Sequence, residues 1–346
     1  MRLALCTTTI HIPHALKLMR KCSSDVKFFV AGDEKTPHDE VFALLKEHCH
    51  PSAYIDKVAA PYELASGEIA ASYKCSEAIG WNTLARRNIA FLEALKWGAD
   101  VIYSWDTDNI PMSMTHFDTI EKILTRPFNG ILGSSKDGWF DAGQMLNPRM
   151  RHRGIPYNNS PLHHYDIATN FRAGIAAGLV IGNPDVDATL RMEKAPEIHT
   201  ISKLGEMGVL VDANTRTVFN TQNVALVRDL VPAWFCMPGV GRYDDLYASL
   251  VVQRVARERG LHVHFGQPLV WQERHQHDQL VDLRAEIGGM SNIRALADLL
   301  DSILLPGKSV IEDTRIIYKT LEHCDFLPDE AIYAAHCWLD DCEGVL

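Results

Sequence analysis

Short apolar runs alternate with stretches of helical spacing along the first 133 residues of the chain. Runs rich in β-branched and aromatic residues predict strands at 2–8, 26–31, 101–105 and 129–133. Apolar residues recurring every three or four positions predict helices at 13–19, 38–48, 81–97 and 115–125. Because strands that alternate with helices favour a parallel sheet with right-handed crossovers, this part of the chain is predicted to be α/β.

The predicted strand at 101–105 ends in two carboxylates one residue apart, Asp106 and Asp108. Loops at this end of an open α/β sheet are where ligands bind, and in an extended stretch the two side chains point the same way. Both can then reach one hard cation, Mn²⁺ or Mg²⁺, and through it a diphosphate. Asp is also an ordinary turn former after a strand, so the pair alone leaves both interpretations open.

Two further residues belong to the same rim of the predicted sheet. Thr8 ends the first strand, where a nucleobase or ribose could lie beside Asp106. Arg87 lies in the helix that leads into the central strand and could reach a diphosphate; the alternative is a solvated helix face. The spacing therefore predicts a nucleotide site assembled from several strand ends.

The pattern changes after residue 133. Residues 134–170 have little periodicity and contain a basic island at 149–153, which predicts a working loop with a positive wall for a phosphate. A strand that begins at 178 is predicted to turn before Asp185. We interpret Asp185 and Asp187 as turn and helix-cap residues and prefer this to a second metal site.

A helix is predicted to begin at Asp244, because apolar residues repeat at helical spacing after it. Asp244 and Asp245 then fall in its first turn, where acidic residues are favoured electrostatically. Two adjacent acids in a pocket would also suit acceptor binding or general-base catalysis. Strands are predicted at 261–265 and 269–271, and residues 282–346 are predicted to be helical, with an apolar stripe for packing or for a homo-oligomer.

Composition limits the class of protein. With 47% hydrophobic residues among 346, the chain can bury one large core or two adjoining ones. A net charge of −10 disfavours a general binder of nucleic acid or of anionic membranes. The sequence has no apolar run of about 18 residues, no signal-peptide pattern and no Cys-x-x-Cys pair, so we expect a cytoplasmic protein with reduced thiols and no membrane span.

Several motifs carry a family resemblance. Arg87-Asn88, an apolar helix, Gly98-Ala-Asp100 and Trp105-Asp-Thr-Asp-Asn109 resemble successive segments of GT-A glycosyltransferases. Within that fold, the chain is most similar to the reversibly glycosylated polypeptide, or UDP-arabinopyranose mutase, family. The resemblance implies a GT-A fold, a UDP-sugar substrate, a metal on Asp106 and Asp108, and a place for Asn88 in the nucleotide site. Thr107 replaces the middle carboxylate of the family triplet.

Later segments extend the resemblance. Arg153-Gly-Ile-Pro-Tyr157 is similar to a family segment whose arginine is implicated in self-glycosylation, while Pro161-Leu-His-His164 stands where a second family arginine is expected. Asn223 matches a family amide that could bind a sugar hydroxyl. Gly241-Arg-Tyr-Asp-Asp245 is nearly identical to the family segment, which implies site roles for Arg242, Asp244 and Asp245.

GT-A enzymes often complete the metal shell with a late histidine. His275 is our candidate for that ligand, with His277 as the alternative.

The sequence thus predicts an α/β fold of GT-A type with a nucleotide-sugar-binding half at 1–133, an acceptor half at 134–278 and a helical extension at 279–346. The expected function is metal-dependent transfer of a glycosyl group from a UDP-sugar to an acceptor hydroxyl on a sugar, a protein or a hydroxylated base in nucleic acid. Asp244 or Asp245 would be the base. Two alternatives stay open, a self-glycosylating UDP-sugar mutase and a noncatalytic protein that binds sugar nucleotides.

Overall fold

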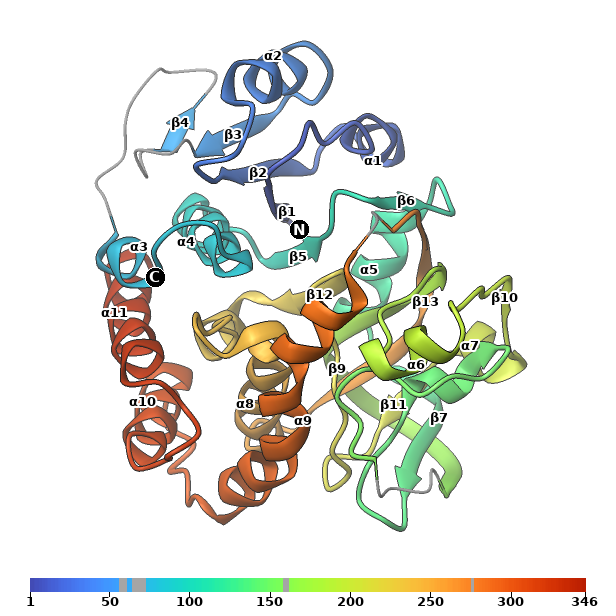
Figure 1. Ribbon diagram of the computed structural model, residues 1–346. Helices are drawn as coiled ribbons and strands as arrows, with labels where there is room; N and C mark the ends of the chain where they lie inside the picture. The colour runs from blue at the N-terminus through green and yellow to red at the C-terminus, as the bar shows by residue number, and fades with distance from the viewer. Residues whose placement is uncertain (56–60, 64–72, 158–161, 275–276) are drawn as a thin grey trace.

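The computed structural model describes residues 1–55, 61–63, 73–157, 162–274 and 277–346. Its main sheet has the strand order β4-β3-β2-β1-β5-β12-β9-β7-β11-β13-β6 (Figure 1). These strands are β1 Leu3–Thr9, β2 Lys27–Gly32, β3 Ser52–Ile55, β4 Pro61–Glu63, β5 Val101–Trp105, β6 Asn109–Pro111, β7 Phe128–Ser135, β9 His163–Gly182, β11 Val209–Val211, β12 Asn223–Val227 and β13 Leu261–Gln272. A separate pair is formed by β8 Leu146–Asn147 and β10 Thr200–Ile201.

The half of the sheet formed by β3, β2, β1 and β5 is parallel, as the alternating pattern predicted. Successive residues of its strands are buried on opposite faces: Leu3 and Leu5 pack with α1, α2 and α5, whereas Ala4 and Cys6 pack with α4. These helices are α1 Leu16–Cys22, α2 His38–His48, α4 Arg87–Trp97 and α5 His116–Thr125. Burial on both faces explains why the strands read as almost continuous apolar runs.

The other half of the sheet is mixed. β12 is antiparallel to both β5 and β9, while β9 pairs antiparallel with β7 and parallel with β13. Since β11 joins β7 to β13, these strands close into a ring. The loop predicted at 134–170 is too long, because β9 already begins at His163. The first residues of β9 are mostly exposed and polar, so the sequence there shows no apolar period. The two strands predicted at 261–265 and 269–271 are one strand, β13.

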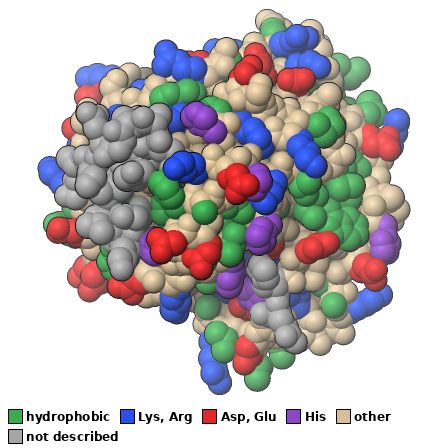
Figure 2. Space-filling model, turned by 90° about the horizontal axis from the view of Figure 1, so that it is seen from above, with side chains coloured by type: hydrophobic (Ala, Val, Ile, Leu, Met, Phe, Trp, Pro, Cys, Tyr) green, Lys and Arg blue, Asp and Glu red, His purple; other side chains and the backbone are tan. Residues whose placement is uncertain are grey.

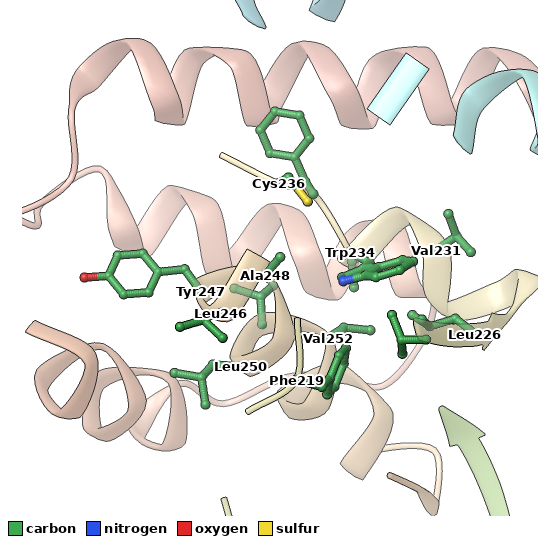
Figure 3. Close-up of a cluster of buried hydrophobic side chains, with 14 of the residues drawn as sticks. Phe219, Leu226, Val231, Trp234, Cys236, Leu246, Tyr247, Ala248, Leu250 and Val252 are labelled. Atoms are coloured by element: carbon green, nitrogen blue, oxygen red, sulfur yellow. The ribbon is translucent and has the colours of Figure 1, made fainter. Parts of the chain in front are cut away.

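Helix α8, Asp244–Arg257, begins at the predicted residue and passes through the core. Its buried side chains, among them Leu246, Ala248 and Val252, pack with Phe219 and Trp234 (Figure 3). The shorter helices of the chain are α3 Lys74–Ile79, α6 Ala188–Glu193 and α7 Lys203–Met207, with 3₁₀ turns η1 Leu84–Arg86, η2 Ala142–Met145, η3 Arg228–Ala233 and η4 Gly241–Tyr243. The packing of α8 fixes the position of the two carboxylates at its start.

The predicted helical C-terminal part is confirmed as α9 Gln279–Ser302, α10 Val310–Leu321 and α11 Asp329–Val345 (Figure 1). It is joined to the rest of the molecule by apolar and polar contacts. Trp338 is buried and its Nε1 donates to the carbonyl of Pro232 at 2.8 Å, and the Asp341 carboxylate accepts from the backbone N–H groups of Lys74 and Cys75. Within the described ranges, none of the helices is long and apolar enough to cross a membrane.

Candidate functional site

Two cavities adjoin at the end of β5. The first is lined by residues of several strand ends, among them Thr8, Asp33 and Arg87, and the second by residues of the other half of the molecule. Asp106 and Asp108 line both, so we call the two cavities together the cleft. They enclose about 770 and 640 Å³ of empty space, part of which is open to solvent.

The first cavity has polar walls that are held by backbone hydrogen bonds. Asp33, at the end of β2, accepts from the N–H groups of Asn82 at 2.7 Å and Thr83 at 3.1 Å. This carboxylate therefore fastens the turn before η1 to the sheet. Thr8 also lines this cavity, near the end of β1, as the sequence predicted.

Arg87 forms an ion pair with Asp106, the first of the two carboxylates after β5. Its Nη2 lies 2.6 Å from Asp106 Oδ1, and its Nη1 donates to Ser104 Oγ at 2.7 Å and to the Thr221 carbonyl at 2.8 Å. Burial lowers the pKa of Arg87, but the neighbouring acidic groups, Asp106 first among them, together outweigh burial and raise this pKa. The guanidinium is thus an orienting partner of Asp106, rather than the solvated side chain of a surface helix.

The oxygen donors around Asp108 fit a hard divalent cation. Gln272, at the end of β13, donates from Nε2 to Asp108 Oδ2 at 3.0 Å, and its buried Oε1 has no hydrogen-bond partner. Carboxylate and amide oxygens are the ligands that Mn²⁺ and Mg²⁺ prefer. Among the described residues, no group of three His, Cys, Asp or Glu could hold a metal ion. A cation on Asp106 and Asp108 would therefore take its further ligands from other oxygens, such as those of the Gln272 amide, the diphosphate or water.

The candidate late histidines have different outcomes. His275 lies outside the described residues, so its proposed metal role is not examined by the structure. His277 lines the second cavity, where its Nδ1 is 3.4 Å from Asp282. Burial, followed by the charge of Arg274, lowers the pKa of His277, which favours the neutral ring at physiological pH.

The second cavity contains an ionic cluster centred on Asp185. Arg153 lies 2.6 Å from this carboxylate, Arg274 lies 3.3 Å away and Arg242 lies 3.5 Å away. Burial alone would raise the pKa of Asp185, but the guanidinium groups hold it well below its usual range. Asp185 was interpreted from the sequence as a turn residue, because nothing local to it indicates that three distant arginines converge there.

The sequence predicted that Arg153 belongs to a positively charged loop that could face a phosphate, but the structure buries this residue. Its side chain is only 5% exposed, and its Nη2 bridges Asp185 and Asp245, the latter at 3.2 Å. The charge of this arginine is compensated inside the protein, while its buried Nη1 has no partner. The outer surface seen from above in Figure 2 likewise shows acidic, basic and histidine side chains intermixed. The charged side chains that line the second cavity are also of both signs.

Asp244 and Asp245 line the second cavity at the start of α8, and both are buried. Asp245 is held by Arg153 and by the Thr221 N–H at 3.3 Å. Asp244 has a different environment, since burial and then the charge of Asp245 raise its pKa to about 7. A carboxyl group that titrates near neutrality can accept a proton at working pH, so this group has the property that a general base needs.

Two predicted residues are not brought to the cleft. Asn88 exchanges hydrogen bonds with the backbone of Cys236, at 2.9 and 3.1 Å. Asn223 accepts from Tyr103 Oη and donates to the Pro268 carbonyl, each at 2.9 Å. These amides fix the core next to the cleft, and a ligand-binding role for either stays a prediction.

Sequence reasoning missed Gln272, Arg274 and Glu286. Gln272 and Arg274 lie just before His275, in a segment where only the histidines were predicted to be ligands. Glu286 lies in a helix that was interpreted as packing surface, yet it is buried and bonded to Arg242 at 3.0 Å. The sequence feature that could have indicated a role for Glu286 is its position, which is in register with the apolar residues of that helix.

Comparison with known proteins points to one family. The family model described as reversibly glycosylated polypeptide matches residues 163–338, just over half of the chain. The match includes Asp185, Arg242, Asp244 and Asp245, which line the second cavity, whereas Asp106 and Asp108 precede it. No curated protein matches the chain. With this match the chain belongs to the reversibly glycosylated polypeptide family, whose members handle glycosyl groups carried by UDP.

Proposed function

We propose that the chain is a glycosyltransferase that binds a UDP-sugar along the cleft and transfers the glycosyl group to an acceptor hydroxyl. The first cavity would take the nucleoside, the second the sugar and the acceptor, and the diphosphate would lie at Asp106 and Asp108 between them. The observation that carries the proposal is the place of Asp244, a buried carboxyl group with a near-neutral pKa in the second cavity. A mutase that only changes the ring form of the sugar would not need a base, because it has no acceptor hydroxyl to deprotonate.

The reaction needs one bond to form and one to break. The acceptor oxygen attacks C1 of the sugar, its proton passes to the Asp244 carboxylate, and the bond from C1 to the phosphate oxygen breaks with its electron pair leaving on UDP. Arg153 holds Asp245, and Asp245 in turn keeps the proton affinity of Asp244 high. When bound, a divalent cation on Asp106, Asp108 and Gln272 would neutralise charge on the diphosphate.

A mutase is the second candidate, and it is favoured by the family. The matching family is named for reversible glycosylation. Arg153 precedes the matched residues, but its motif Arg153-Gly-Ile-Pro-Tyr157 resembles the family segment whose arginine is linked to self-glycosylation. In such a reaction the sugar would return to the same nucleotide in another ring form. The buried Arg153–Asp185 pair would then serve the sugar ring, and Asp244 would have no acceptor to deprotonate.

A panel of UDP-sugars tests both candidates. The chain is incubated with each, with and without Mn²⁺ and with sugar, peptide and hydroxymethylated DNA acceptors. Transfer gives UDP and an acceptor heavier by one glycosyl unit; a mutase gives a chromatographically distinct UDP-sugar of unchanged mass. Intact-mass measurement adds a third readout, because a sugar adduct that vanishes in Arg153→Ala would favour the mutase. No UDP-sugar binding and no product with any combination would refute the proposal.

A further inference from the structure

One face of α9 is shaped to fit the turn that precedes Asp244. Asp282, Ala285, Glu286 and Gly289 are spaced to lie on a single side of the helix, and they face η4, Gly241–Tyr243. A Cβ at Gly241 would collide with the Ala285 carbonyl, and a Cβ at Gly289 would collide with the Tyr243 ring. Helix and turn are therefore in direct contact at two glycines, where no side chain fits.

Charged groups join the same two segments. Glu286 is buried, and its carboxylate accepts from Arg242 Nε at 3.0 Å and from the N–H of Ala188 at 2.8 Å. Arg242 also lies 3.5 Å from both Asp282 and Asp185. An unbroken series of ion pairs thus runs from Glu286 through Arg242, Asp185 and Arg153 to Asp245.

We propose that α9 positions the reacting carboxylates: its face formed by Asp282, Ala285, Glu286 and Gly289 fixes Gly241–Tyr243, and with it the start of α8 that carries Asp244 and Asp245. Glu286 and Gly289 are positioning residues, since neither lines the cleft where ligands would bind. The helix outside the predicted α/β halves thereby becomes part of the site. The inference rests on the proposed function for its meaning in catalysis, but the placement of the carboxylates can be tested without it.

Adjacent glycines in α9 offer a matched pair of variants. A Cβ at Gly288 has nothing within 4 Å, whereas one at Gly289 meets Tyr243. Gly288→Ala and Gly289→Ala change helix propensity equally, so their difference isolates the contact with the turn. We expect Gly288→Ala to behave as wild type. Gly289→Ala should lower turnover of the best UDP-sugar by on the order of 100-fold through misplaced carboxylates, with UDP affinity in Mn²⁺ unchanged.

Glu286→Gln tests the charged part of the contact and is isosteric. Removing a negative charge leaves the neighbouring arginines less neutralised, so the Asp244 carboxyl should titrate at lower pH in a ¹³C NMR experiment. The acid limb of turnover against pH should move the same way, and Glu286→Asp, which keeps the charge, should restore the wild-type titration. A purely structural role would move the melting temperature but neither titration.

The inference is overturned if Gly289→Ala and Gly288→Ala turn over equally and the Asp244 titration in Glu286→Gln coincides with wild type. Should Gly289→Ala fail to fold, the two Glu286 variants still decide. The proposed function fails by another result, a wild-type chain that binds no UDP in Mn²⁺ and releases none from any UDP-sugar. The NMR titrations then still report whether Glu286 of α9 acts on Asp244.

Discussion

Asp185 and Asp244 are both buried carboxylates, yet their surroundings shift their proton affinities in opposite directions. Arginines outweigh the effect of burial at Asp185 and keep it ionised. At Asp244 burial acts together with the negative charge of Asp245. Groups whose pKa values are pushed apart in one cavity are candidates for distinct roles, one as a fixed charge and the other as a proton acceptor.

The first prediction concerns the pH dependence of turnover. Because Asp244 must be deprotonated to accept a proton, kcat should rise about tenfold per pH unit up to about pH 7 and then level off. In Asp245→Asn the midpoint should move to lower pH, since the charge that raises the pKa of Asp244 is gone. Asp244→Asn should lower kcat by about 10²-fold or more while UDP binding is retained. A kcat that does not depend on pH between 5 and 8 would contradict the base assignment.

The second prediction concerns the cation. Asp108→Asn removes an oxygen donor beside Gln272, so calorimetry should show Mn²⁺-dependent UDP binding weakened by more than about tenfold. Asp166→Asn is the matched control, because it removes the same charge from an exposed position on β9. If the two variants bind UDP equally well, Asp108 holds no metal.

At the scale of elements, the sequence predicted those strands and helices whose burial leaves a regular apolar pattern. β1, β2, β5 and the start of α8 were found because burial on both faces and a helical apolar stripe leave clear periods. The four-residue strand β3 of the same parallel half was not predicted. The beginning of β9 was missed, because its residues pair with one neighbour and stay mostly exposed. Thr8, Arg87, Asp106 and Asp108 were placed together correctly by strand-end reasoning. The Asp185 cluster could not be found, since its arginines come from three separate segments.

The third prediction uses His264, a buried residue of β13. Burial lowers its pKa to about 4, against about 6.5 in an unfolded chain. Since the folded pKa is the lower one, its contribution to stability is complete above pH 6.5 and is lost as the pH falls towards 4. Between pH 7.5 and 4.5, wild type should therefore lose about 2 to 3 kcal/mol more unfolding free energy than His264→Gln, measured by urea titration. Equal losses would show that His264 has the same pKa in the folded protein as in the unfolded chain.

One of the two hydrophobic clusters runs through all three predicted parts of the chain. Buried residues of α10 and α11 belong to the same cluster as Phe91 of α4 and Leu246 of α8. The boundaries at 133 and 278 therefore cut through continuous packing, and as domain limits they stay predictions. The family match likewise crosses the second boundary, because it runs from 163 to 338.

The fourth prediction follows from this shared core. A chain that ends at residue 278 should expose the partners of Trp338 and lose its cooperative thermal transition. It should also bind a hydrophobic dye such as ANS. A chain that ends at residue 343 removes only residues at the end of α11 and should melt as wild type. A cooperative transition in the shorter chain would mean that residues 1–278 fold alone.

The bonds between Asp341 and the start of α3 join positions about 267 residues apart, and this separation matters while the chain is being made. At roughly 5–20 residues per second, a ribosome needs on the order of 13 to 50 s to translate from Lys74 to Asp341. For most of that interval, once Trp97 has been translated, the nascent chain has completed α3 and α4 but lacks α11, the helix that packs against both. The apolar surface of this pair is then open to chaperones and to neighbouring nascent chains, so the tempo of translation becomes a determinant of yield.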